Sequence, residues 1–277
     1  MTQQDIGKFR KNLKDQYYTK ESIAKQYVDT ILHWLPKTKE YLWIEPSAGT
    51  GRFLKVLPAT IERIGLDLEP KATEILQQDF LTWTPPPTSK PMLVFGNPPF
   101  GRQGSLAKAF LRHACSFAQI VAFILPRSFQ KPSMSNCIPQ HFHCIYSMEI
   151  VADAFEVNGQ SYDVPCVFQI WQTQETNRPE VAAIEPKGFS YVKPIQSYHI
   201  AFRRVGGTAG HCSVGPGLFN PNTHYFIRLE DRYIPSLREI CDKLNKQNYV
   251  HNTLGPRSIS KREANIAIND LLVDILS

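Results

Sequence analysis

Short apolar runs alternate with amphipathic stretches along the first part of the chain. Each run is a few residues long and ends in polar residues, glycine or proline, which predicts buried strands. We expect these strands at residues 41–44, 61–66, 92–95, 119–125, 146–151 and 164–171. Apolar positions at helical spacing predict helices at residues 3–14, 20–35, 71–76 and 104–117, and another that starts near residue 52. Thr19 is the expected N-cap of the second helix. This alternation indicates an open, mainly parallel α/β sheet with one antiparallel strand at its end.

The pattern changes after Gln172, where a polar stretch with a proline suggests a domain boundary. Strands are predicted at residues 198–204 and 225–229, and helices at 236–245 and 261–276. The Ser260 to Glu263 segment is a capping box for the last helix. We therefore divide the chain into an N-terminal extension, an α/β domain and a small C-terminal α+β subdomain. Their expected bounds are 1–14, 15–175 and 176–277.

One apolar run ends in an unusual polar turn, Asn97-Pro98-Pro99-Phe100. Neither proline can donate a hydrogen bond to a strand partner, so the strand must stop at Asn97. The Asn97 side chain and a backbone carbonyl can accept two hydrogen bonds from one exocyclic amine, and an aromatic ring can stack on the base that carries the amine. An ordinary proline-rich turn explains the same residues equally well.

A glycine-rich turn follows the strand at residues 41–44. It reads Glu45-Pro46-Ser47-Ala48-Gly49-Thr50-Gly51, between a strand and a helix. In that context the glycines permit a sharp turn and a close approach of the backbone to a ligand. Asp67 ends the next strand, where a carboxylate can accept hydrogen bonds from ribose hydroxyls.

Composition narrows the class of protein only a little. The chain has 277 residues, of which 42% are hydrophobic and 20% charged, and no apolar run is long enough for a membrane span. The formal net charge of +6 is compatible with a polyanionic partner. Six scattered cysteines without a C-x-x-C pair indicate reduced thiols of an intracellular protein of the cytoplasm or nucleus. Cys137, His141, His143 and Cys144 match no common zinc spacing, so no metal is expected.

Taken together, the segments resemble class I S-adenosylmethionine-dependent methyltransferases. The resemblance is strongest to the DNA adenine-N6 methyltransferases whose cofactor motifs precede an N-P-P-F catalytic motif, the gamma order. It covers about residues 15–172 and implies a Rossmann-like fold with a seven-stranded sheet. The segments that carry it are 16–19 (Q-Y-Y-T), 45–51, 79–85 (D-F-L-T-W-T-P), 97–100, 126–129 and 151–155.

The resemblance also implies which residues bind S-adenosylmethionine. Glu45 would accept a hydrogen bond from the ammonium group, Thr19 would reach the carboxylate, and Asp67 would hold the ribose. Asp79 would bind the adenine amino group while Phe80 packs on the ring. The full expected cofactor set is Tyr17, Tyr18, Thr19, Glu45, Pro46, Ser47, Ala48, Gly49, Gly51, Asp67, Leu68, Asp79, Phe80 and Asn97.

The expected catalytic residues are those of the turn, Asn97, Pro98, Pro99 and Phe100. By resemblance, Phe100 and Phe155 would stack on the two faces of the target base. The sequence departs from the family after Phe155, because residues 156–160 read E-V-N-G-Q where basic residues are often expected. This departure weakens both the stacking role of Phe155 and any phosphate contact there.

These residues predict an enzyme that transfers a methyl group to the N6 amine of adenine in nucleic acid. DNA is favoured slightly over RNA because segments 16–19 and 79–85 resemble the DNA enzymes. The same turn also serves RNA adenine-N6, RNA guanine-N2 and protein-glutamine methyltransferases, and a catalytically silent nucleic-acid-binding subunit is a different class. Candidate nucleic-acid contacts are Arg102, Lys108, Arg127, Arg203, Arg204 and Arg257. Residues 176–277 would serve substrate recognition, and their small number leaves room for a protein partner.

Overall fold

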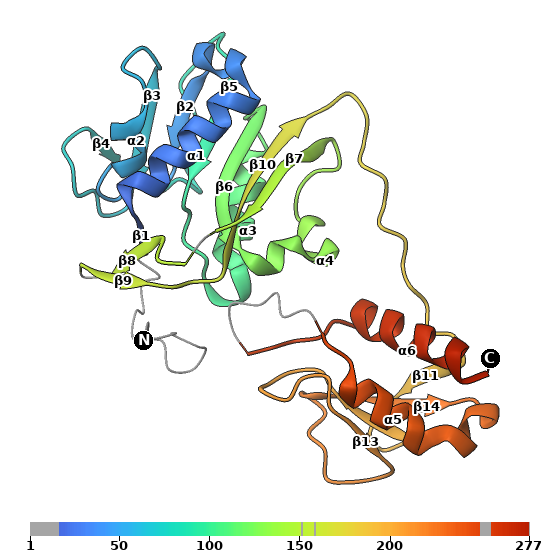
Figure 1. The fold of residues 1–277 in the computed structure, drawn as a ribbon. Coiled ribbons are helices and arrows are strands. Elements are labelled where there is room, and N and C mark those ends of the chain that lie inside the picture. Colours follow the sequence, from blue (N-terminus) through green and yellow to red (C-terminus); the bar gives the residue numbers. More distant parts are fainter. Residues whose placement is uncertain (1–16, 151, 158, 250–255, 277) are drawn as a thin grey trace. The chain divides into compact units, whose positions relative to one another are not determined.

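The structure, a computed structural model, describes residues 17–150, 152–157, 159–249 and 256–276. The chain divides into two compact units, residues 1–179 and 180–277, and each is described by itself. Figure 1 colours the first unit from blue to yellow and the second from yellow to red. The predicted extension at 1–14 and its helix lie outside the described residues.

The first unit is built on a seven-stranded sheet. In spatial order the strands are β4 (Ile75–Gln77), β3 (Arg63–Asp67), β2 (Leu42–Glu45), β5 (Met92–Gly96), β6 (Ile120–Pro126), β10 (Cys166–Thr173) and β7 (Phe142–Glu149). Neighbouring strands from β4 to β6 run parallel, whereas β10 is antiparallel to both β6 and β7. This arrangement confirms the predicted Rossmann-like α/β fold with one antiparallel strand. That strand, β10, is not at the end of the sheet as predicted, because it lies between β6 and β7.

Burial explains why these segments form strands. All seven residues of β6 and the first six of β10 are buried, as expected for central strands that are covered on both faces. Strand β7 at the edge alternates between buried or half-buried and exposed positions over much of its length. The sequence signal for β7 is correspondingly weaker, and the strand begins several residues before the predicted start.

The helices of this unit are α1 (Glu21–Trp34), α2 (Arg52–Val56), α3 (Ser105–Ala114) and α4 (Pro132–Ser135). Short 3-10 helices span Pro36–Glu40, Arg102–Gly104 and Arg127–Gln130. Figure 1 shows α1 against one face of the sheet, where Tyr27 stacks on Phe168 of β10 with ring centroids 4.3 Å apart. This contact joins the first helix of the unit to its last strand.

Two local predictions were wrong. Residues 71–76 do not form a helix, because Ile75 and Leu76 pair with Gly65 and Leu66 as the start of the parallel strand β4. Six residues give a helix too little length to offset its costly nucleus, so the sheet pairing wins. Thr19 is not the N-cap of α1 either, since Lys20 takes that position and Thr19 belongs to a strand.

A smaller, three-stranded antiparallel sheet forms from segments far apart in the sequence. It consists of β1 (Tyr18–Thr19), β8 (Phe155–Val157) and β9 (Gln160–Tyr162), in the order β1-β8-β9. Tyr18 pairs with Glu156, and Thr19 pairs with Phe155. The predicted cofactor segment and the predicted base-stacking segment are therefore adjacent strands.

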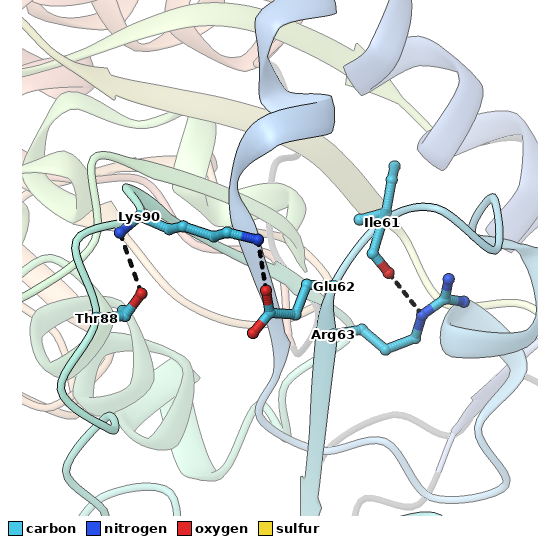
Figure 2. Close-up of polar contacts among 5 residues, drawn as sticks. All are labelled: Ile61, Glu62, Arg63, Thr88 and Lys90. Atoms are coloured by element: carbon cyan, nitrogen blue, oxygen red, sulfur yellow. Dashed lines mark hydrogen bonds and ion pairs between the residues drawn. The ribbon is translucent and has the colours of Figure 1, made fainter.

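Polar contacts fix the loops at the opposite end of the large sheet, where β3 and β5 begin (Figure 2). Lys90 Nζ forms an ion pair with Glu62 at 2.6 Å, and the Lys90 backbone N–H donates to Thr88 Oγ1 at 3.1 Å. Arg63 Nε donates to the Ile61 carbonyl at 3.1 Å. These contacts lie at the amino ends of the two strands, and none of them occupies the carboxyl ends.

The second unit is an α+β subdomain, as predicted. Its antiparallel sheet has the order β11 (Phe189–Val192), β14 (His224–Leu229), β12 (Ile200–Arg203) and β13 (Cys212–Val214). The helical elements are a 3-10 helix at Asp231–Ser236, α5 (Leu237–Lys246) and α6 (Lys261–Leu276). Residues from sheet and helices share one buried core. The predicted capping box is present, because Ser260 N and Oγ both donate to Glu263 Oε2 at 2.7 Å. Across the described ranges, no helix has the length and apolarity to cross a membrane.

Candidate functional site

The candidate site lies between the carboxyl ends of β2 and β5, where the order of strands in the large sheet reverses. Ligands of open α/β sheets bind at this switch point. Glu45 ends β2 and Gly96 ends β5, so the glycine turn and the Asn97 turn meet there. A cavity of about 510 Å³ opens at this point. The predicted residues that line it are Tyr17, Tyr18, Thr19, Glu45, Pro46, Ser47, Ala48, Gly49, Asp67, Leu68, Asp79, Phe80, Asn97 and Pro99.

The glycine turn has the conformation that its residue types permit. Gly49 and Gly51 have φ angles of 52° and 74°, in the left-handed region that favours glycine. The Gly49 backbone N–H donates to Asp67 Oδ2 at 2.7 Å, and the Glu69 N–H donates to Asp67 Oδ1 at 2.8 Å. A Cβ atom at Gly49 would lie 3.1 Å from the Tyr18 ring, so a larger residue would press on this turn.

Glu45 is a buried carboxyl group at the floor of the site, with 2% of its surface exposed. Burial raises its pKa well above the ordinary 4.5, and the charge of Asp67 raises it further, while a hydrogen bond with the Leu54 backbone lowers it. Gly96 makes room for this side chain, because a Cβ atom there would lie 3.2 Å from Glu45 Cγ. The φ of Gly96, 126°, also favours glycine.

Asn97 is held from two sides but keeps one free acceptor. Its Nδ2 donates to the Tyr17 carbonyl at 2.9 Å, and its own carbonyl accepts from Ser47 Oγ at 3.0 Å. Asn97 Oδ1 is buried without a hydrogen-bond partner. The described part of the chain has six such buried, unpartnered side-chain atoms, and three of them line this cavity: Thr19 Oγ1, Glu45 Oε2 and Asn97 Oδ1. Their unmet capacity indicates a polar ligand.

The small β1–β8–β9 sheet is attached to the glycine turn through Arg52 at the start of α2. Arg52 forms an ion pair with Glu156 at 2.7 Å and donates to the Thr19 carbonyl at 3.0 Å. Lys20 pairs with Asp153 at 2.8 Å. The glutamate that replaces an expected basic residue after Phe155 therefore contacts a cation of the protein itself.

The far side of the cavity is apolar. Phe80 is buried, and its ring centroid lies 5.1 Å from that of Phe110. Leu106 and Phe110 come from α3, where a spacing of four residues places both on one face. The sequence analysis missed them, although this spacing directly after the Asn97 turn was a usable signal. The other lining residues that it missed are Thr50, Arg52, Phe53, Glu69, Gln78 and Leu81.

Four predicted residues do not line the cavity: Gly51, Pro98, Phe100 and Phe155. Phe100 and Phe155 are 2% and 1% exposed. Phe100 lies under Tyr17, with the two rings stacked at a centroid distance of 6.4 Å. A base could stack on Phe100 only after this ring is uncovered, so the stacking roles stay predictions.

The candidate nucleic-acid contacts are distributed over both units. Arg102 is exposed and Lys108 half-buried near the Asn97 turn, while Arg127 pairs with Glu149 at 3.2 Å. The other three predicted cations, Arg203, Arg204 and Arg257, belong to the second unit. No three His, Cys, Asp or Glu side chains gather as a metal site within the described ranges.

Comparisons with known proteins find similar structures but no similar sequences. No protein-family model and no curated protein sequence matches the chain. A candidate RNA methyltransferase from Pyrococcus horikoshii is similar in structure, with a TM-score of 0.45, 16% identity, and coverage of 58% of this chain and 88% of that protein. A candidate class I S-adenosylmethionine-dependent methyltransferase from Listeria monocytogenes has a TM-score of 0.43, 13% identity, and coverage of 62% and 65%.

The methyltransferase subunit of a type I restriction-modification system from Streptococcus thermophilus is also similar. Its TM-score is 0.44 at 15% identity, and the match covers 92% of this chain and 57% of that subunit. At these values the likeness carries no argument about substrate. The fold rests on the strand order of this chain, and the chemistry rests on the residues at the cavity.

Proposed function

We propose that this protein is an S-adenosylmethionine-dependent methyltransferase that acts on the N6 amine of adenine in nucleic acid. The observation that carries the proposal is the buried, unpartnered Oδ1 of Asn97 at the end of β5. A hydrogen-bond acceptor held in place by two other contacts of the same residue is suited to a donor that arrives with the substrate. An exocyclic amine is such a donor.

The cavity residues fit the cofactor group by group. The Glu45 carboxylate would receive the ammonium group, and Thr19 Oγ1 would donate to the cofactor carboxylate. Asp67, at the end of β3, would accept from the ribose hydroxyls with lone pairs that the backbone amides leave free. The apolar wall of Phe80, Leu106 and Phe110 suits the adenine ring. The positive ammonium would also offset the burial of the Glu45 charge.

The residues of the turn would activate a poor nucleophile. S-adenosylmethionine supplies a methyl group bound to a positively charged sulfur. The lone pair of an aromatic amine is delocalised into the ring, and two acceptors, Asn97 Oδ1 and the Pro98 carbonyl, would draw charge onto the nitrogen by binding its two N–H groups. The same acceptors would stabilise the cation that forms when the methyl–sulfur bond breaks and the methyl–nitrogen bond forms. That cation then releases one proton to solvent, so catalysis is orientation plus preorganised electrostatics. A base in a duplex must be flipped out or already unpaired to reach the turn.

The product identifies the substrate. Full-length protein is incubated with methyl-labelled S-adenosylmethionine and with DNA, RNA or protein, and each polymer is digested to its nucleosides or amino acids. We expect the label on adenine N6, with DNA favoured over RNA on the motif resemblance. Label on guanine N2 or on glutamine would contradict the proposal, and so would the absence of cofactor binding in calorimetry, which would leave a silent binding subunit.

Replacing Asn97 tests its role. Asn97→Ala should lower the single-turnover rate roughly a hundredfold or more, because one acceptor for the reacting amine is lost. Affinity for S-adenosylmethionine should stay close to that of the wild type in calorimetry. Asn97→Ala also releases the Tyr17 carbonyl, so Ser47→Ala serves as the control that loosens the same turn without touching the acceptor. Equal rates for Asn97→Ala and Ser47→Ala would remove Asn97 from the mechanism.

A further inference from the structure

Two cations and two tyrosines of the second unit form a compact cluster where the end of β12 meets the start of α6. The backbone brings these elements together, because Ile259 N donates to the Arg204 carbonyl at 2.8 Å and Gly206 N donates to the Arg257 carbonyl at 2.9 Å. We name Arg204, Lys261, Tyr191 and Tyr225 the tyrosine–cation cluster. The sequence alone marks both cations as candidate nucleic-acid contacts, but it does not place the two tyrosines beside them.

Each cation of the cluster lies over an aromatic ring. Lys261 Nζ is 4.8 Å from the centre of the Tyr191 ring, and Arg204 Cζ is 5.4 Å from that of Tyr225. The two rings meet edge to face, with centroids 5.3 Å apart. This distance range is that of cation–π contacts. The two rings that carry the cations are therefore direct neighbours.

The rings are themselves fixed at their far ends. The Tyr191 hydroxyl donates to Asn265 Oδ1 at 2.6 Å, and the Tyr225 hydroxyl donates to the Ile259 carbonyl at 3.2 Å. Burial raises the pKa of both phenols, so the rings stay neutral at physiological pH. The cations thus rest on rigid, uncharged supports.

An aromatic support holds a cation without cancelling its charge. Other cations of this unit are neutralised locally: Arg232 pairs with Glu230 at 2.8 Å, and Lys243 pairs with Glu239 at 3.0 Å. Within the described ranges, Arg204 and Lys261 have no carboxylate partner. The nearby Glu263 accepts two hydrogen bonds from Ser260 at the capping box. The amino end of α6 adds partial positive charge beside Lys261.

We infer that the tyrosine–cation cluster binds phosphates of the nucleic-acid backbone. The inference rests on the proposed function, which makes nucleic acid the substrate, and it names the surface of the second unit that contacts it. Such contacts position a protein on its substrate and contribute affinity without reading the bases. Binding through this cluster should therefore be independent of sequence and sensitive to salt.

The test compares two double variants of the full-length protein. Arg204→Gln/Lys261→Gln removes the charges of the cluster, and Arg232→Gln/Lys243→Gln removes two charges of the same unit that already have carboxylate partners. Lys261, Arg232 and Lys243 are exposed and Arg204 is half-buried. Thermal unfolding therefore checks that each variant is folded. Affinity for a fluorescent oligonucleotide, of the strand type that the protein methylates, is measured by anisotropy across a series of salt concentrations.

The cluster variant should bind roughly tenfold or more weakly at low salt, and the slope of log affinity against log salt should fall by about two. The control variant should match the wild type in both readouts. Affinity for S-adenosylmethionine should be unchanged in both. Restoring charge with Arg204→Lys/Lys261→Arg should restore most of the affinity and the full slope.

Two outcomes would overturn the inference, and they differ. If the wild type binds nucleic acid and the cluster variant keeps its affinity and salt slope, this surface is wrong and the proposed function stands. If the wild type binds S-adenosylmethionine but no nucleic acid, the substrate class in the proposed function is wrong as well. An equal loss in both double variants would assign the effect to net charge and would also reject the site.

Discussion

Three side-chain oxygens at the cavity have hydrogen-bonding capacity that the described protein does not use. They come from a strand end, a turn and a two-residue strand: Glu45, Asn97 and Thr19. Leaving a buried polar atom unpaired costs about 1–3 kcal/mol. A bound ligand that pairs these three atoms would offset this cost. The ligand-free protein should therefore be less stable than a variant in which one of these atoms is replaced by a group that needs no partner.

Glu45→Gln tests separately what the buried carboxyl group costs in stability and what it contributes to cofactor binding. The folded pKa of Glu45 is raised above the ordinary 4.5, so the folded protein keeps the proton at a pH where the unfolded chain has released it. The contribution of Glu45 to folding stability is therefore fully present below the pKa that this group has in the unfolded chain. It is lost as the pH rises through the pKa of the folded protein. Glu45→Gln should raise the unfolding temperature of the ligand-free protein at pH 7 and change it little near pH 4.

The same substitution should weaken cofactor binding. Glutamine cannot supply the negative charge for an ammonium group, and we expect affinity for S-adenosylmethionine to fall roughly tenfold or more. Differential scanning fluorimetry without ligand and calorimetry with it measure the two effects. A variant that is destabilised at pH 7, or that binds as tightly as the wild type, would contradict this role of Glu45.

Most residues that the sequence analysis named line one cavity, and the residues of its apolar wall on α3 were missed. The roles of the named residues stay predictions. Residues next to glycine or proline at strand ends were found, because proline restricts the residue before it and glycine permits the sharp turn that follows a strand. Leu106 and Phe110 were missed, since a leucine and a phenylalanine on a helix have the same pattern whether they face a core or a cavity. The burial of Phe100 under Tyr17 depends on a contact between distant segments that no local pattern encodes.

At the scale of elements, the β1–β8–β9 sheet pairs a segment from the start of the first unit with segments near its end in the sequence. Arg52 attaches this sheet to the glycine turn. Long, strongly patterned elements were predicted within a few residues, and α6 was predicted at its observed bounds. The small sheet was not predicted, because β1 has two residues and its partner is more than a hundred residues away. Short strands of this kind depend on tertiary pairing rather than on local propensity.

Breaking the ion pair between Arg52 and Glu156 should loosen this sheet. Glu156 does not line the cavity, although its partner Arg52 does, so Glu156→Gln acts on the binding surface only through Arg52. The two side chains are about 30% exposed, and such pairs contribute about 0.2–1 kcal/mol. We expect affinity for S-adenosylmethionine to fall by up to about fivefold, with a smaller dependence on salt than in the wild type.

The exposed pair between Lys25 and Asp29 on α1 offers a matched control. Its ion pair has the same length, 2.7 Å, and neither residue lines the cavity. Asp29→Asn should leave the calorimetric affinity unchanged. If Asp29→Asn weakens cofactor binding as much as Glu156→Gln does, the effect belongs to general electrostatics and not to the attachment of β8.

At the scale of the whole molecule, the two units have separate cores. The buried cluster of the second unit draws only on residues between Phe189 and Leu272. The proposed cofactor site lies entirely in the first unit. We therefore expect a chain that ends at Pro179 to fold and to bind S-adenosylmethionine with the affinity of the full chain, while its affinity for nucleic acid falls.

Circular dichroism and calorimetry check folding and cofactor binding of the shortened chain, and anisotropy checks nucleic-acid binding. Loss of cofactor binding in a folded first unit would show that the second unit supports the site. Undiminished affinity for nucleic acid would place the substrate contacts in the first unit alone, at cations such as Arg102. The change of pattern after Gln172 predicted two parts, but no sequence pattern encodes how they share a substrate.

The position of β10 has a consequence for how the protein is made. This strand is the last of the large sheet to leave the ribosome, yet it lies between β6 and β7 and pairs with both. A growing chain can contain all the other strands of this sheet, up to β7, while the edge of the fully apolar β6 that pairs with β10 is still open. Open apolar edges are where nascent chains associate wrongly. Chains whose synthesis stalls before Cys166 should thus aggregate rather than fold into a less active protein. Pausing of the ribosome at that point would lower the yield of folded protein.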